Sequence, residues 1–481
     1  MQGRCRASCR CGALPPLASI GVMGDMTVAA AVAATPDTRD RFVDLVRVGS
    51  LVGVVLGHFA MAAVTLDHAT GTVDIANVLE FAPWTRPLTL LFQVMPLFFV
   101  VGGFAHAVAW VSLRRRGGGY ADFVHARIGR LIRPTLVFVS VWMAAAVVIE
   151  TVWGDSPATG PLLQIAGQLL WFIGIYLIAA ALAPALHAAH RRWGGWVLAA
   201  LMLAAIAVDA ARLAGGVDGV KWLNFAFVWL AIHQLGFFYA DGVADRWGPR
   251  RLGATMLAVG TLAVAALVAW GPYGLSMVSY EGEELSNLAP PTVALLAFGV
   301  AQAGAALLVR GPVRRALAQR RVWAVVVAGG AVAMTAFLWH FTALVAIYAA
   351  LWVAGVDLEA DPTTASFWWT KLALLPVFLV VVAGLVAAWR RFDRPPRRDG
   401  LVGVGRARAA VAALAVACAI VGMLAFAVVG FRGAASGYVG RLVGLPVTAW
   451  AALALTVAAA ILAEAAVRRV SRVAEAEGSQ G

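Results

Sequence analysis

Three side chains that could take part in chemistry lie in the first long apolar segment of the chain, residues 41–64: Asp44, Arg47 and His58. Arg47 and His58 are eleven positions apart, close to three helical turns, so both lie on one helix face about 16 Å apart along the axis. Asp44 precedes Arg47 by three positions and can pair with it there. Ionisable groups in a segment suited to lipid should face a bundle interior or a wet cavity, which indicates a functional site. The structural alternative is an arginine that extends to the membrane surface and a histidine that packs against a neighbouring helix.

A second group consists of Arg127, Arg130 and Arg133, which recur every three residues in the segment 113–133 between two apolar stretches. If this segment is helical, the three guanidinium groups form an i, i+3 row. Guanidinium groups bind phosphate through paired hydrogen bonds, so the row suits a nucleotide-bearing cofactor such as coenzyme A. The alternative is a set of basic residues that orients the chain in the membrane and contacts anionic lipid headgroups.

Two further candidates lie toward the opposite side of the membrane. His340, in the sequence F-L-W-H-F, is about 18 residues from the basic end of its apolar segment, and His58 is about 16 residues into its own. Two intramembrane histidines at similar depth can meet across a helical bundle, so we consider His340 a candidate substrate-binding residue. The loop 271–291 contains hydroxyl groups, carboxylates and Asn287, which could bind a polyhydroxylated acceptor or simply form a solvated loop.

The composition predicts that membrane-spanning helices carry these residues. The 481-residue chain is 62% hydrophobic and 13% charged, which is too apolar for a soluble domain of this size. The apolar runs are continuous over about 20 residues rather than alternating, which favours helices over a β-barrel. We predict an all-α polytopic membrane protein with twelve spans: 42–64, 88–112, 134–153, 161–186, 196–213, 222–240, 252–270, 291–309, 322–345, 367–389, 408–430 and 446–467.

The distribution of charge orients these spans and argues against nucleic acid as a partner. The formal net charge is +13, but 31 of the 38 basic residues fall in alternate loops and their flanking span ends. This is the positive-inside pattern of cytoplasmic segments in a protein whose partner is the lipid bilayer. The pattern predicts that both termini are cytoplasmic. Cys5, Cys9 and Cys11 lack the paired spacing and the histidines of a zinc site, and we expect no metal.

Four motifs in order resemble the membrane-bound acyltransferase 3 family. They are Arg47 and His58 separated by ten residues, P-L-F-F-x-x-x-G-F at 96–104, R-x-x-R at Arg127/Arg130 or Arg130/Arg133, and L-W-H ending at His340. The resemblance covers residues 39–392 and implies a ten-helix bundle. Two features depart from it, because the chain carries no appended esterase-like domain and has two extra helices.

We therefore divide the chain into an acyltransferase 3-like domain and four flanking parts. The expected N-terminal part is a disordered tail or a segment before a true start at Met23 or Met26. After the domain we expect a basic linker, a hairpin of two extra transmembrane helices and a cytoplasmic tail. The boundaries are 1–38, 39–392, 393–407, 408–467 and 468–481.

The resemblance implies a multi-pass enzyme of the cell (inner) membrane that transfers an acyl group, commonly acetyl, from acyl-CoA to a hydroxyl of an envelope carbohydrate or glycolipid. His58 would act as general base, since histidine titrates near neutrality, or form an acyl-histidine intermediate. Arg47 would hold a phosphate or pantetheine group or stabilise developing negative charge, and the arginine row would bind the CoA phosphates. The alternative is a polytopic transporter or exporter that moves a small molecule or an acylated glycan without acyl transfer.

Overall fold

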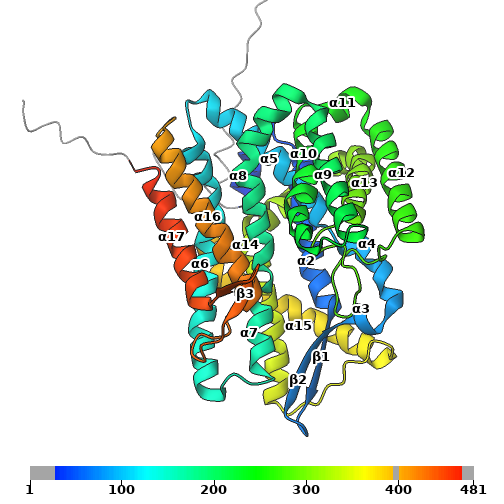
Figure 1. Ribbon diagram of the computed structural model, residues 1–481, viewed down its shortest axis with the longest axis vertical. Coiled ribbons are helices and arrows are strands. Elements are labelled where there is room, and N and C mark those ends of the chain that lie inside the picture. Colours follow the sequence, from blue (N-terminus) through cyan, green and yellow to red (C-terminus); the bar gives the residue numbers. More distant parts are fainter. Residues whose placement is uncertain (1–27, 394–399, 469–481) are drawn as a thin grey trace, which may run out of the picture.

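The computed structural model describes residues 28–393 and 400–468, and within them almost all regular structure is helical. Eleven helices of this part of the chain are long and apolar enough to cross a membrane. The prediction of an all-α polytopic membrane protein is confirmed (Figure 1). Eleven of the predicted spans coincide with these helices, and the last corresponds to a shorter apolar helix of 17 residues.

The helices that correspond to the predicted spans follow in chain order, one of them interrupted by a short break. They are α2 (Arg41–Met61), α5 (Met95–Arg115), α6 (Tyr120–Trp153), α7 (Thr159–Gln168) with α8 (Leu170–Trp193), α9 (Gly195–Leu213), α10 (Asn224–Ala240), α12 (Pro249–Trp270), α13 (Val293–Leu317), α14 (Arg320–Val353), α15 (Ala365–Trp389), α16 (Arg406–Val429) and α17 (Ala449–Ala465). Short helices connect or flank them: α1 (Val28–Ala33), α3 (Val78–Phe81), η2 (Pro83–Leu88), α4 (Thr89–Phe92), η3 (Asp218–Leu223), α11 (Val243–Trp247) and η4 (Arg390–Asp393).

The bundle has two chemically different ends. At one end, which we call the arginine-rich end, α5 and α8 finish and α12 and α14 begin with arginines. At the other, the hairpin end, α2 leads into a β-hairpin of β1 (Ala62–Asp67) and β2 (Thr72–Asn77) (Figure 1). Because α2 and α14 both begin at the arginine-rich end, they run parallel to each other. The positive-inside pattern predicts that the arginine-rich end faces the cytoplasm.

The β-hairpin was not predicted, since residues 65–87 read as a loop. Its strands pair antiparallel from Ala62 opposite Asn77 to Asp67 opposite Thr72. The carboxylate of Asp67 accepts hydrogen bonds from two backbone N–H groups of the turn, and Gly71 supplies the left-handed conformation at φ +67°. Leu66 also bridges to Leu358 beyond α14, so the hairpin is held against the loop between α14 and α15.

The segment that carries the arginine row is helical rather than a loop. It forms the first half of the 34-residue helix α6, which continues through Pro134. Asp122 stabilises the start of this helix, because its carboxylate accepts from the backbone N–H groups of Gly119, Val402 and Gly403. The contact also fixes residues just before α16 beside α6. The condition for an i, i+3 row, a helical segment, is therefore met.

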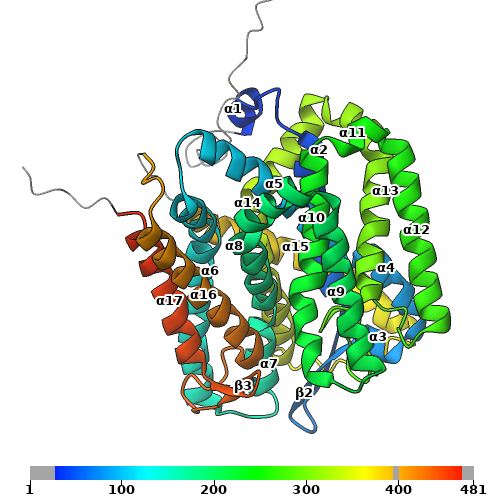
Figure 2. The same ribbon diagram turned by 45° about the horizontal axis from the view of Figure 1, so that its top comes forward.

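The two helices predicted as an appended hairpin are built into the bundle. Both views show α16 and α17 side by side along α6 (Figures 1 and 2). A Cβ at Gly167 of α7 would lie 2.7 Å from Gly430, so small residues allow the two chain segments to touch. Glu150 of α6 accepts from the backbone N–H groups of Gly433, Ala435 and Ser436 in the connection after α16. A short antiparallel pair, β3 (Gly440–Leu442) and β4 (Leu445–Val447), precedes α17.

Parts of the predicted flanking segments lie outside the described residues. These are 1–27 of the N-terminal tail, 394–399 of the basic linker and 469–481 of the cytoplasmic tail. Residues 28–38 of the expected disordered tail are described and contain α1. The indole N–H of Trp323 donates to Thr35 Oγ1 at 3.0 Å, which ties this part of the tail to α14.

Candidate active site

The structure brings the two intramembrane histidines together where α2 and α14 pack. Nδ1 of His58 lies 2.9 Å from Nε2 of His340, and the rings stack at 12° with centroids 5.1 Å apart. His340 is fully buried, and His58 is half-buried. The ring of Phe341 lies against both imidazoles, with centroids 4.8 and 4.9 Å away. The two polar rings are therefore held in a largely apolar environment, where each has few hydrogen-bond partners other than the opposite ring.

The hydrogen bonds of His340 fix the proton positions of the pair. Nδ1 of His340 lies 2.6 Å from the carbonyl oxygen of Phe337, and a carbonyl only accepts, so this nitrogen carries the proton. In a neutral imidazole the other nitrogen, Nε2, is then an acceptor. It accepts from Nδ1–H of His58, which leaves Nε2 of His58 with a free lone pair. No described residue bonds to that atom, so it is available as a base.

Arg47 lies on the same helix, closer to the arginine-rich end. Its Nη2 is 3.4 Å from Asp44 Oδ1, which is the pairing expected from the sequence. The stronger partner of Asp44 is Arg39, whose Nε and Nη2 lie 2.5 and 2.8 Å from the carboxylate oxygens. Asp44 is thus engaged by Arg39, and Arg47 keeps most of its capacity to bind an anion. Gly330 of α14 makes room for it, because a Cβ there would lie 3.3 Å from Arg47 Nη2.

Arg127 and Arg130 of α6 join Arg47 in a positive cluster. The three guanidinium groups lie near enough to repel one another, and the ring of Tyr176 on α8 lies near them. Within the described part of the chain Arg127 and Arg130 form no ion pair, and Arg127 Nε is buried without a partner. Gly102 of α5 leaves space for the ring of Tyr176, since a Cβ at this position would lie 2.9 Å from the ring. We call Arg47, Arg127 and Arg130 the arginine cluster.

Two of the predicted site residues are engaged elsewhere. Arg133 Nη2 lies 3.0 Å from Glu464 Oε1 of α17. An i, i+3 row winds around the helix by about 60° per step, so Arg133 points about 120° away from Arg127. The fully buried Asn287 donates to the carbonyl oxygens of Gly274 and Ser276 and accepts from Thr292 Oγ1. It stabilises the loop between α12 and α13, and its role toward an acceptor stays a prediction.

Sequence reasoning missed other buried polar contacts. His106 of α5 and His233 of α10 form a second histidine pair, with Nδ1 and Nε2 3.0 Å apart. The two helices approach closely beside this pair, because a Cβ at Gly103 would lie 1.9 Å from the His233 carbonyl oxygen. Lys371 of α15 is also buried, and its Nζ lies 3.0 Å from the carbonyl oxygen of Phe59.

The fold and the polar centre define a class: an integral membrane protein whose helical bundle encloses a histidine pair and an arginine cluster. Comparison with protein families identifies the family, since residues 40–389 match a family model described as an acyltransferase domain. The chain therefore belongs to the acyltransferase 3 family and is a membrane acyltransferase. No curated protein matches it, and no solved structure does.

Proposed function

We propose that this multi-pass acyltransferase of the cell (inner) membrane moves an acyl group, most simply acetyl, from acyl-CoA to a hydroxyl of an envelope carbohydrate or glycolipid. The observation that carries the proposal is the free Nε2 lone pair of His58, whose ring is fixed by a hydrogen bond to His340 of α14. His58 shares α2 with Arg47. A fixed base about 16 Å along one helix from an arginine of a cluster that suits phosphate is the arrangement this reaction requires.

The arginine cluster supports acyl-CoA as the donor. Arg127 and Arg130 have no carboxylate partner among the described residues, and unpaired guanidinium groups in a partly buried site favour phosphate strongly. Arg47 of this cluster lies on the same helix, α2, as His58. About 16 Å separates Arg47 from His58 along α2, so the extended thiol arm of CoA would lie along this helix with its thioester toward the histidine.

In the proposed reaction, Nε2 of His58 removes the proton of the acceptor hydroxyl as its oxygen attacks the thioester carbonyl. The C–O bond forms, the C–S bond breaks, and the imidazolium returns its proton to the departing thiolate. During the step Nε2 of His340 accepts a hydrogen bond from Nδ1–H of His58. This bond keeps the Nε2 lone pair of His58 directed at the hydroxyl of the acyl acceptor. The donor would approach from the arginine-rich end and the acceptor from the hairpin end or laterally.

The test is acyl transfer by wild-type membranes given labelled acetyl-CoA and envelope glycans. His58→Ala should lower kcat/KM by a factor of about 10²–10⁴, the usual contribution of a general base. His187→Gln is a matched control, because this half-buried histidine of α8 contacts Phe237 and not the site. Transfer that survives His58→Ala would remove His58 from the mechanism. Transport of a solute without any acyl transfer would overturn the proposed function, and label kept on the wild-type protein would indicate an acyl-histidine route.

A further inference from the structure

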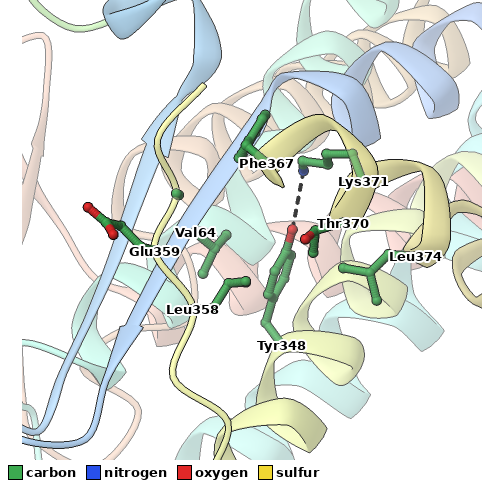
Figure 3. Close-up of a pocket in the computed structure, with 9 residues that line it drawn as sticks. Val64, Tyr348, Leu358, Glu359, Phe367, Thr370, Lys371 and Leu374 are labelled. Carbon is green, nitrogen blue, oxygen red and sulfur yellow. Dashed lines mark hydrogen bonds between the residues drawn. The ribbon is translucent and has the colours of Figure 1, made fainter. Parts of the chain in front are cut away.

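A narrow pocket lies at the hairpin end, between the β-hairpin, the end of α14 and the start of α15. Its lining includes Val64 of β1, Tyr348 of α14, and Phe367, Thr370 and Lys371 of α15. Figure 3 shows the lysine and tyrosine side chains directed toward each other from the two helices. Neither side chain has a part in the acyl-transfer steps described above.

Lys371 is buried in this pocket with its charge uncompensated. Its side chain is almost fully buried at 6% exposure, and Nζ donates to the carbonyl oxygen of Phe59 at 3.0 Å and to the Tyr348 hydroxyl at 3.2 Å. Both acceptors are neutral. Nζ also lies 5.0, 5.8 and 5.6 Å from the ring centroids of Phe59, Tyr348 and Phe367, so aromatic faces stabilise the ammonium group.

No carboxylate of the described residues forms an ion pair with Lys371. The acid that shares the pocket lining, Glu359, is exposed, and Figure 3 shows its carboxylate on the far side of the loop from the ammonium group. An ammonium group has three donors, and two of them are used. A buried cation with a free donor and no counter-charge favours an anionic ligand.

The choice of lysine is itself specific. Only two of the 38 basic residues are lysines, Lys221 and Lys371. Lys221 is paired with Asp218 outside this pocket. At the buried position a compact ammonium point charge fits among three aromatic rings, whereas a planar guanidinium would need more space.

We propose that Lys371 and Tyr348 form an anion-binding subsite for the acyl acceptor, which recognises a carboxylate or phosphate oxygen of the glycan. The proposal rests on the proposed function. The subsite adjoins the base, because Lys371 holds the carbonyl of Phe59, the residue next to His58. It lies on the hairpin side of the histidine pair, the side opposite the arginine cluster. The acceptor is thus an acidic sugar or a phosphate-bearing glycan, held by its charge while a neighbouring hydroxyl reaches His58.

The contact with Phe59 also gives Lys371 a structural role, since a cation near the last carbonyl groups of α2 stabilises the end of that helix. The two roles predict different effects of a Lys371 substitution on charged and neutral acceptors. A lysine that only stabilises the helix affects charged and neutral acceptors equally. A lysine that binds the acceptor affects the charged one alone.

The experiment compares KM for galacturonate with KM for galactose, and KM for glucose 1-phosphate with KM for glucose. For wild-type protein, KM for the charged member of at least one pair should be about tenfold or more below KM for the neutral member. One hydrogen bond to a charged group accounts for a difference of this size. The first pair tests a carboxylate and the second a phosphate. Lys371→Met should abolish the preference, Lys371→Arg should retain part of it and Tyr348→Phe should reduce it several-fold. Lys221→Met is the matched control and should leave it unchanged.

Equal KM values for charged and neutral sugars in the wild type would overturn the subsite, as would an equal loss for both in Lys371→Met. A binding measurement separates this proposal from the proposed function. The melting temperature of the detergent-solubilised full chain should rise with galacturonate or glucose 1-phosphate in wild type but not in Lys371→Met. If that rise occurs without any acyl transfer, only the proposed function fails. If transfer depends on His58 but shows no charge preference and no such rise, only the subsite fails.

Discussion

Replacing His340 tests whether it orients His58 through a hydrogen bond. Glutamine places its amide where Nε2 of the imidazole lies, so its carbonyl oxygen can accept from Nδ1–H of His58. Asparagine is shorter: its amide nitrogen occupies the Nδ1 position and keeps the bond to the Phe337 carbonyl, but it does not reach His58. The two variants are amides that differ by one methylene group and in whether they reach His58, a contact that measures 2.9 Å in the wild type.

The size of the effect follows from the buried donor that His340→Asn leaves behind. An unpaired buried donor costs about 1–3 kcal/mol, which corresponds to a factor of about 5–150 in kcat/KM at 1.36 kcal/mol per tenfold. Without its acceptor, His58 can also shift its proton to Nε2, which removes the base. We expect His340→Gln to retain most activity, His340→Asn to lose it by that factor, and His58→Ala to be lower than both.

The assay is release of free CoA thiol in the presence of acceptor, with initial rates taken over a range of acceptor concentrations. Melting temperatures of the variants control for a loss of folded protein, since both amides replace a buried ring. Equal activity of the two amide variants would refute the reasoning, because it would show that the contact with His58 has no part in catalysis. A wild-type rate in His340→Asn would have the same consequence.

Two further perturbations address the donor site and the hairpin. The double variant Arg127→Gln with Arg130→Gln should raise KM for acyl-CoA by about tenfold or more with little change in kcat, because it removes phosphate contacts made equally in the ground and transition states; an unchanged KM would reduce these arginines to orientation signals. Hydrogen bonding to Asp357 and to the Trp352 carbonyl raises the pKa of exposed His68 above 6.5, and His68 holds the pKa of Asp357 below 3.8. The pair therefore stabilises the hairpin fully between about pH 4 and 6.5 and loses this contribution as the pH rises through the raised histidine pKa. His68→Gln should lower the melting temperature by a few degrees at most at pH 5.5 and hardly at pH 9, and an equal shift at both values would contradict the charged pair.

The spans could be predicted because hydropathy is a local property summed over about 20 residues. The placement of Arg47 and His58 on one face follows from helix geometry in the same local way. Predicting the contact between His58 and His340 needed one further step. The distribution of charge orients the two spans, and in that orientation the two histidines lie at similar depth in the membrane. The structure brings these two residues together.

Contacts that depend on which helices are neighbours could not be predicted from the sequence. His106 and His233 lie in different predicted spans, and no spacing rule relates α5 to α10. The burial of Lys371 depends on the β-hairpin and the loop beyond α14, which enclose the start of α15. Arg133 shares its row with Arg127, but only the position of α17 decides that it pairs with Glu464. In each case a long-range packing arrangement, not a local preference, determines the partner.

The parallel packing of α2 and α14 explains how one pair of helices sets both halves of the site. Arg47 lies beside Gly330 near the arginine-rich end, and His58 bonds to His340 farther along. The spacings are eleven residues on α2 and ten on α14, so the two contacts stay on facing sides of helices with the same rise. The distance between the arginine cluster and the base is therefore fixed by helix rise rather than by loops. If the proposed reaction holds, loop differences at the hairpin end change which acceptor reaches His58 without moving this histidine away from the arginine cluster.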